Sequence, residues 1–222
     1  MSWLGALVLG FLLGMRHALD PDHVVAVATF VSRERRVLSA LRVGAMWGLG
    51  HTATVFLLGG AMIVFGLALS PRLGMSLELS IGAMLVLLGA LNVWAVTRGK
   101  HEHESPHAVL PRRRRLQPLL VGSMHGLAGS AAIVLLVLAT LREPMLQLAY
   151  LAVFGVGTLL GMSALTGAMA APLALASRRF ASFGRNLTAI TGALSIAFGL
   201  FVVYQIGVVD GLFTGELAYN PR

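Results

Sequence analysis

Residues 14–32, GMRHALDPDHVVAVATFVS, decide the fold because they place charged side chains in the middle of an apolar stretch. Five ionisable residues fall within eight positions, and apolar runs flank them at residues 3–13 and 24–31. These flanks are too apolar for a surface loop, so we expect the polar cluster near the middle of a membrane span. Ionisable groups at that depth are costly and usually serve a binding site or a transport pathway. The five residues are Arg16, His17, Asp20, Asp22 and His23.

Pro21 is expected to break the helix that carries this cluster. On an unbroken helix His17 and His23 would point about 120° apart and could not share one ion. Proline has no N–H for the carbonyl of His17, and it pushes Asp20 out of the α region. The helix should therefore stop just before Asp20 and restart at Pro21, with Asp20 as N-cap. The two histidines and the next carboxylate then converge, and the freed carbonyl of His17 becomes a further possible ligand.

Two imidazoles and two carboxylates make a ligand set typical of a divalent transition-metal site. Broken helices whose exposed backbone lines a cavity at the bilayer midplane are characteristic of transporters. A purely structural interpretation is the alternative: Asp20 only caps the second helix, Arg16 only pairs with a carboxylate, and the histidines are satisfied core residues. A set of His, Asp and His on both sides of a helix break favours the metal site.

The composition is that of an integral membrane protein. Of the 222 residues, 57% are hydrophobic and 12% are charged, and the mean hydropathy is +0.82. A span takes about 20 apolar residues, which leaves room for about six helices and no separate soluble domain. The chain has no cysteine, which excludes thiolate ligands, disulfides and thiol redox relays. The formal charge of +8 lies mostly in loops, where it sets membrane topology rather than indicating a nucleic-acid partner.

We therefore expect an all-α membrane protein of six spans, the first of them broken at the metal motif. The loop over 98–117 holds the tract HEHESPH and four consecutive arginines, and it is the longest polar segment. It separates a first three-helix repeat over 1–97 from a second three-helix repeat and short tail over 118–222. The expected spans are 3–31, 41–69, 77–96, 116–141, 145–175 and 187–208.

Positive charges fall almost wholly on one side of this layout. The loops after the first, third and fifth spans carry most of the arginines, whereas the other side has only Arg72, Arg142 and Arg222. The positive-inside rule then places those three loops in the cytoplasm and both termini outside the cell. We expect a multi-pass protein of the inner (plasma) membrane, with the four-arginine run 112–115 bound to anionic membrane lipid.

The two halves resemble each other at an offset near 108 residues. Residues 15–19 (MRHAL) align with 123–127 (SMHGL), and 47–50 (WGLG) align with 154–157 (FGVG). Three spans per half is an odd number, so such a repeat is inverted in the membrane, and inverted repeats place transport sites at their interface. Chance similarity between glycine-rich helices is the alternative, because small residues pack membrane helices in any case. The third pair of helices aligns through Gly82 and Gly89 with Gly192 and Gly199.

The run from Arg16 to His23, RHALDPDH, resembles the signature of the nickel/cobalt transporter (NiCoT) family, R-H-A-x-D-A-D-H with an H-x4-D-H core. Residues 50–52, Gly-His-Thr, resemble its second motif, a Gly-His followed by hydroxyl residues. With the six-span layout the resemblance covers most of the chain. Pro21 stands where the family usually has Ala, and the family's later acidic motif is missing. The shorter layout is similar to the compact, UreH-like nickel permease branch.

The resemblance implies a permease for Ni²⁺ or Co²⁺ as transported substrate, with no prosthetic group and no enzymatic activity. Imidazole and carboxylate suit both ions, although Zn²⁺, Mn²⁺ and Fe²⁺ use the same donors. The resemblance implies that His17, Asp22 and His23 bind the ion. Asp20 and His51 are the next candidates for ligands. We place His51 and His125 along the path, with a packing role through a hydrogen bond as the alternative for each.

Two other functions are weighed beside uptake. A Ni²⁺/Co²⁺ exporter could share the same spans and site, although the brief HEHESPH tract argues weakly against it. An intramembrane metal enzyme is the alternative of another class, but no H-E-x-x-H or Ser/His arrangement is present. For uptake, proteins that mature nickel enzymes are the possible downstream partners.

Overall fold

The structure is a computed structural model that describes residues 3–34, 36–67, 69–98, 116–128, 141–179 and 183–215. Within these ranges every regular element is a helix. Nearly all of the loop predicted over 98–117, and the second half of the predicted fourth span, lie outside them. The helices are α1 (Trp3–His17), α2 (Pro21–Val31), α3 (Val37–Phe65), α4 (Pro71–Thr97), α6 (Pro144–Arg179) and α7 (Phe183–Tyr204), with a helical segment over 116–128 and a π-helical turn over Gln205–Val209.

These helices have the lengths of membrane spans. Among the described residues, α3, α4, α6 and α7 are each long and apolar enough to cross a membrane, and the bent pair α1 and α2 makes a fifth candidate. This confirms the prediction of a helical, multi-pass membrane protein. The segment 116–128 falls where the fourth span is expected.

The predicted break at Pro21 is present. The helix α1 ends at His17, α2 begins at Pro21, and the two helices are bent by 54°. Asp20 is the N-cap with extended backbone (φ −60°, ψ 144°), as expected for a residue before proline. Its side chain makes no capping hydrogen bond, which leaves the carboxylate free for another role.

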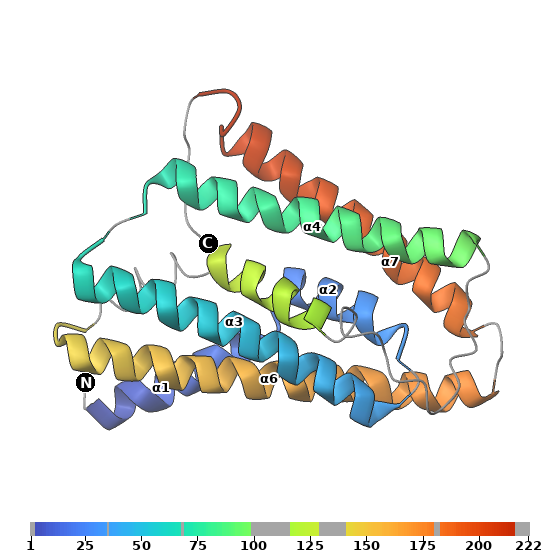
Figure 1. Ribbon diagram of the computed structural model, residues 1–222, viewed down its shortest axis with the longest axis horizontal. Helices are drawn as coiled ribbons and strands as arrows, with labels where there is room; N and C mark the ends of the chain where they lie inside the picture. The colour runs from blue at the N-terminus through green and yellow to red at the C-terminus, as the bar shows by residue number, and fades with distance from the viewer. Residues whose placement is uncertain are drawn as a thin grey trace.

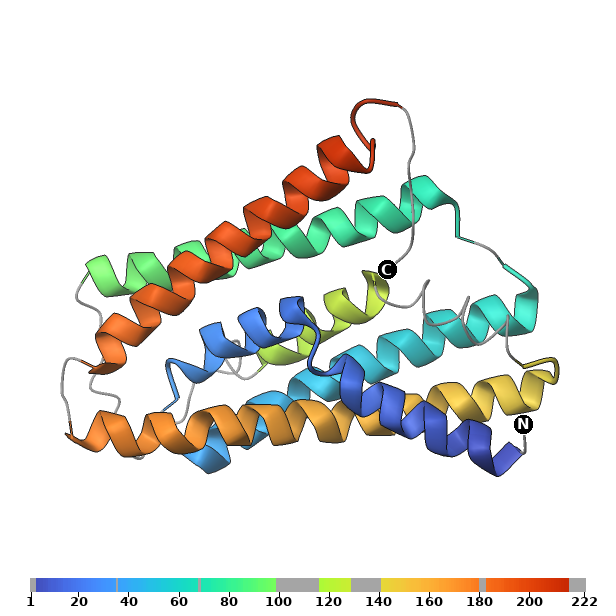
Figure 2. The same cartoon turned by 180° about the vertical axis from the view of Figure 1, so that it is seen from behind.

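The helices form two packed groups with α2 between them (Figures 1 and 2). In the first group α6 packs on both α1 and α3; in the second, α4 pairs with α7. The short α2 contacts α3, α4, α6 and α7. Two hydrogen bonds fix it: the side chain of Asn92 in α4 donates to the carbonyl of Thr29, and Thr188 in α7 donates to the carbonyl of Ser32. The C-terminal end of α2 is thus tied to both helices of the second group.

Glycines allow the helices of the first group to approach closely. A Cβ on Gly14 of α1 would collide with the carbonyl of Phe154 in α6. A Cβ on Gly122 of segment 116–128 would collide with the carbonyl of Trp47 in α3. Small residues serve this purpose in membrane helix packing, because apolar burial alone does not drive helices together in lipid.

The α4–α7 pair has reciprocal glycine contacts. A Cβ on Gly82 would meet the carbonyl oxygen of Gly199 at 3.0 Å, and one on Gly199 would meet that of Gly82 at 2.6 Å. Gly89 and Gly192 face each other in the same way. Two glycines of one helix therefore contact the two that the sequence aligns with them, in crossed order.

Candidate metal centre

Four histidines from separate helical segments meet at the helix break. His17 ends α1, His23 lies in the first turn of α2, His51 is in α3, and His125 is in segment 116–128. His23 is central: its ring centroid lies 4.7 Å from that of His17, 5.2 Å from His51 and 5.0 Å from His125. The rings of His23, His51 and His125 are fully buried, and the side chain of His17 is 18% exposed.

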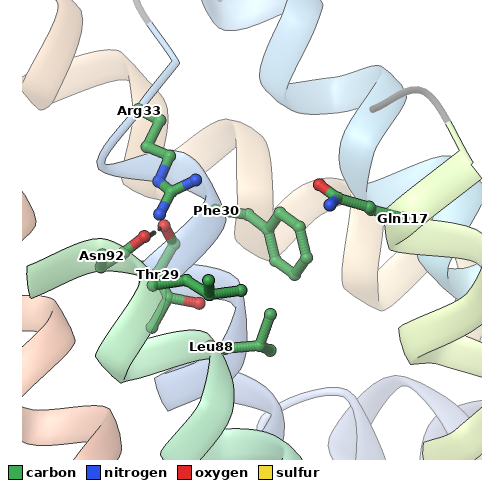
Figure 3. Close-up of a pocket in the computed structure, with 7 residues that line it drawn as sticks. Thr29, Phe30, Arg33, Leu88, Asn92 and Gln117 are labelled. Carbon is green, nitrogen blue, oxygen red and sulfur yellow. Dashed lines mark hydrogen bonds between the residues drawn. The ribbon is translucent and has the colours of Figure 1, made fainter. Parts of the chain in front are cut away.

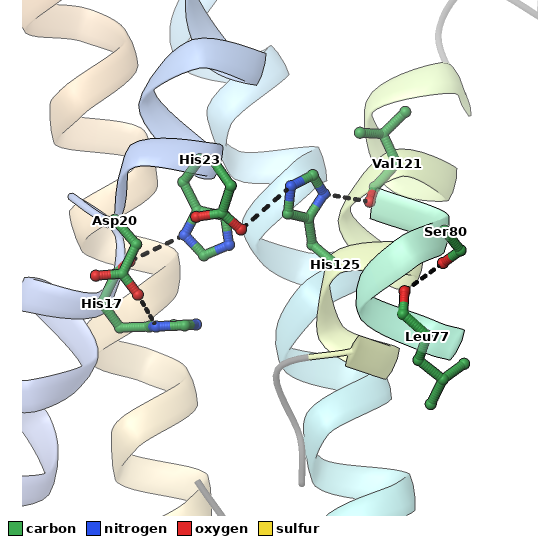
Figure 4. A network of polar contacts seen from close by, with 8 residues as sticks. His17, Asp20, His23, Leu77, Ser80, Val121 and His125 are labelled. Carbon is green, nitrogen blue, oxygen red and sulfur yellow. Dashed lines mark hydrogen bonds and ion pairs between the residues drawn. The ribbon is translucent and has the colours of Figure 1, made fainter. Parts of the chain in front are cut away.

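Three of the rings are oriented by hydrogen bonds at Nδ1 (Figure 4). Nδ1 of His17 donates to Oδ2 of Asp20 over 2.7 Å, and Nδ1 of His23 donates to the carbonyl of His17 over 2.9 Å. Nδ1 of His125 donates to the carbonyl of Val121 over 3.2 Å. Because each partner is an acceptor oxygen, each neutral ring keeps its lone pair on Nε2. Metal-binding histidines are held in this way, with the second nitrogen donating to an oxygen.

The remaining ring nitrogens have no hydrogen-bond partner among the described residues. Nε2 of His17, Nε2 of His125 and both ring nitrogens of His51 are buried without a hydrogen bond. A buried polar atom without a partner costs about 1–3 kcal/mol, so several around one centre are expensive for packing alone. This argues against the interpretation of these histidines as satisfied core residues. Lone pairs grouped in this way are what a transition-metal ion requires.

The donors form two overlapping groups. Ring nitrogens of His17, His23 and His51 lie within 4.8 Å of one another, and donor atoms of Asp22, His23 and His125 do the same. Oδ2 of Asp22 is 3.7 Å from Nε2 of His125. Five of the six residues expected to contact metal therefore come together.

Two other oxygen groups at the helix break accept hydrogen bonds from rings of the cluster. Asp20 belongs to neither donor group, and its carboxylate accepts a hydrogen bond from the ring of His17. The carbonyl of His17, a further possible ligand in the sequence analysis, accepts the hydrogen bond that orients His23. The carboxylate of Asp20 and the carbonyl of His17 thus each accept a hydrogen bond from Nδ1 of a histidine in the cluster.

Two aromatic rings pack against the cluster, one beside His125 and one beside His17. The buried Trp47 in α3 lies 5.1 Å from the ring of His125 and 6.4 Å from that of His23. Phe154 in α6 lies 5.4 Å from the ring of His17. Sequence reasoning did not assign these residues to the site. The available signal was the alignment of WGLG at 47–50 with FGVG at 154–157, which makes them counterparts.

A small pocket lies beyond Trp47. The Trp47 ring packs on Phe30 at 5.7 Å, and Phe30 lines a cavity of about 30 Å³ (Figure 3). This volume admits at least one water molecule. Its other lining residues come from α2 and the turn after it, from α4 and from segment 116–128: Thr29, Arg33, Leu88, Leu91, Asn92 and Gln117. The order from cluster to pocket is thus His125, Trp47, Phe30.

Comparison with known proteins gives matches over up to 95% of the chain. A family model described as NicO, a high-affinity nickel-transport protein, matches residues 3–108. Urease accessory protein UreH of Bacillus sp. (strain TB-90) is 36% identical over 221 residues, and the alignment covers 95% of each chain. A putative nickel/cobalt efflux system of Methanocaldococcus jannaschii is 25% identical over 201 residues, covering 88% of this chain and 91% of that protein. The Arabidopsis thaliana Chloroplast protein FOR GROWTH AND FERTILITY 1 is 26% identical over 225 residues, covering 91% of this chain and 60% of its own length. No solved structure matches the chain.

Proposed function

Because the chain belongs to the NicO family of high-affinity nickel-transport proteins, we propose that it carries Ni²⁺ or Co²⁺ across the membrane through its buried His/Asp cluster. The observation that carries this proposal is the group of buried ring nitrogens without hydrogen-bond partners at the helix break. The family is one of transporters, so the intramembrane enzyme is set aside. Nickel and cobalt are substrates here, in transit through the site.

The donor chemistry agrees with these ions. Neutral imidazole nitrogens with one carboxylate suit Ni²⁺ and Co²⁺, whereas Mg²⁺ and Ca²⁺ prefer oxygen-rich sites. We assign five residues as metal ligands and Asp20 as the residue that orients one of them. The proposed ligands are His17, Asp22, His23, His51 and His125.

We propose that the six spans form two inverted repeats, over 1–97 and 118–222, joined by the loop 98–117. An inverted repeat requires that each contact between the halves has a counterpart shifted by about 108 residues. The glycine contacts meet this requirement: Gly14 faces the carbonyl of Phe154, and its counterpart Gly122 faces the carbonyl of Trp47. The crossed glycines of α4 and α7 follow the same rule. Sites at such an interface are suited to alternating access.

The proposed direction is uptake. We place the protein in the inner (plasma) membrane. The basic loops favour an orientation with those loops in the cytoplasm and both termini outside. UreH, which matches over 95% of both chains, is named a urease accessory protein. Inward transport is the direction that would bring the ion to enzymes inside the cell. Nickel-enzyme maturation proteins are then the proposed recipients of the ion. Efflux is the second candidate, favoured by the name of the archaeal relative.

The test is radiolabelled Ni²⁺ flux in proteoliposomes of known protein orientation. Inward flux above that of protein-free vesicles, competed by Co²⁺ more strongly than by Zn²⁺ or Mn²⁺, is expected. Flux only in the outward direction would replace uptake with efflux. No flux of either ion, with monodisperse protein and in both orientations, would overturn the transport proposal.

A further inference from the structure

The donor atoms around His23 divide into two sides. His17 and His51 contribute ring nitrogens on one side, and Asp22 and His125 contribute donors on the other. Among the described residues, no group of mutually close donors contains both His51 and His125. The aromatic neighbours divide in the same way, because Phe154 packs on His17 and Trp47 packs on His125.

We propose that the cluster is two overlapping metal sites and that one ion passes between them by exchanging ligands around His23. The imidazole site consists of His17, His23 and His51, and the carboxylate site consists of Asp22, His23 and His125. This inference rests on the proposed transport function and concerns how the same cluster moves its ion.

The hydrogen bond of His23 makes the two sites mutually exclusive. Its Nδ1 donates to the carbonyl of His17, so Nε2 is its only ligand atom. One nitrogen lone pair binds one ion at a time. Only one of the two sites is therefore complete in any chain at any moment, although each has donors of its own.

The short step between the sites keeps the ion bound throughout. Metal–imidazole bonds are about 2.0–2.1 Å long, so two positions that share Nε2 of His23 are at most about 4 Å apart. The ion can leave His17 and His51 for Asp22 and His125 without leaving His23. A full return to water between the sites is then unnecessary, which matters for a centre so deeply buried.

The charges of the two sites differ. The imidazole site offers three neutral donors, whereas the carboxylate of Asp22 offsets one charge of a divalent ion. Burial strengthens this difference, because opposite charges attract more strongly away from water. The ion is therefore drawn toward the carboxylate site, beside Trp47 and on the side of the pocket that Arg33 lines. In the orientation proposed above, this is the direction of the cytoplasm.

The experiment removes one unshared histidine from each site. His51→Leu, His125→Leu and the double variant are purified with the wild type and with Thr158→Val. Thr158 is the counterpart of His51 in the second half, is fully buried and donates its hydroxyl to the carbonyl of Phe154 in the same helix, so its variant controls for altered packing. Bound Ni²⁺ per chain is measured by equilibrium dialysis, the imidazole count by X-ray absorption, and Ni²⁺ flux in proteoliposomes.

The wild type and Thr158→Val are expected to bind one ion and to transport it. His51→Leu should keep one ion with two imidazoles and a carboxylate, and His125→Leu should keep one ion with three imidazoles. Both single variants should lose flux, because each blocks the transfer. The double variant should bind more weakly than either single variant by more than the about 10-fold that loss of an outer-shell partner costs, since neither site retains its third ligand.

Four outcomes would overturn the two-site inference. They are two ions per wild-type chain, the same ligand shell in both single variants, normal flux in either one, and no bound ion in a single variant that is as heat-stable as the wild type. The proposed transport function fails by a different result, in which the wild type itself neither binds nor transports Ni²⁺ or Co²⁺.

Discussion

Replacing Asp20 by asparagine is expected to weaken Ni²⁺ binding by about 10- to 100-fold without abolishing it. Oδ2 of Asp20 accepts the Nδ1 hydrogen of His17 over 2.7 Å. The carboxylate holds the ring in position and makes its Nε2 a stronger donor. Asparagine keeps an acceptor oxygen but removes the negative charge. The loss corresponds to about 1.4–2.7 kcal/mol of binding free energy.

The helix break should survive this change, so the measured effect belongs to the site. The Asp20 side chain makes no capping hydrogen bond, and asparagine is as good an N-cap as aspartate. Asp22→Asn is the matched comparison, because it makes the same chemical change in a residue that lies within a donor group. It should weaken binding more than Asp20→Asn does.

The assay is competition for Ni²⁺ with a chelating dye in detergent, with thermal unfolding of each apo protein measured alongside. Unchanged affinity in Asp20→Asn would refute the claim that this carboxylate prepares His17 as a ligand. Complete loss of binding, equal to or beyond that of Asp22→Asn, would make Asp20 a ligand itself and refute its assignment as an orienting residue.

Three further predictions concern packing and the surroundings of the site. Gly14→Ala, whose Cβ collides with the Phe154 carbonyl, should lower the free energy of unfolding by about 1–3 kcal/mol in thermal melts. The control Gly184→Ala has open space around its Cβ and should not lower it. Equal stability of the two variants would contradict the close helix contact. Asn92→Leu removes the bond from α4 to α2 and should cost about 1 kcal/mol in the same melts, whereas no change would mean that this bond does not hold α2. Ni²⁺ should quench the fluorescence of Trp47, the one tryptophan placed beside the histidines; quenching that persists in Trp47→Phe would place the ion elsewhere.

The sequence predicted the break because its causes are local. Pro21 removes a helical hydrogen bond and restricts Asp20, and both effects depend only on neighbouring residues. The start of α4 also has a local cause in the sequence. The helix begins at Pro71 rather than at the expected residue 77, and the side chain of Ser70 accepts a hydrogen bond from the backbone N–H of Leu73. This serine and proline are an ordinary helix-start pattern.

The roles of individual site residues depend on packing and could not be read from spacing. Asp20 can cap a helix, bind a metal or orient a histidine, and the sequence does not distinguish these three roles. In the structure the bend brings the carboxylate against Nδ1 of His17, which favours the orienting role. His51 and His125 reach His23 only because α3 and segment 116–128 pack closely through glycines such as Gly122. Their division into two sides follows from the same packing.

The central claim is that the ion crosses through the buried cluster, and the most direct measurement is Ni²⁺ flux by His23→Leu against Thr158→Val in matched proteoliposomes. Both residues are buried, but only His23 contributes to both donor groups. The account predicts that His23→Leu has no flux above protein-free vesicles while Thr158→Val transports at the wild-type rate. Wild-type flux in His23→Leu would contradict it, because the ion would then cross without the one ligand that both sites share.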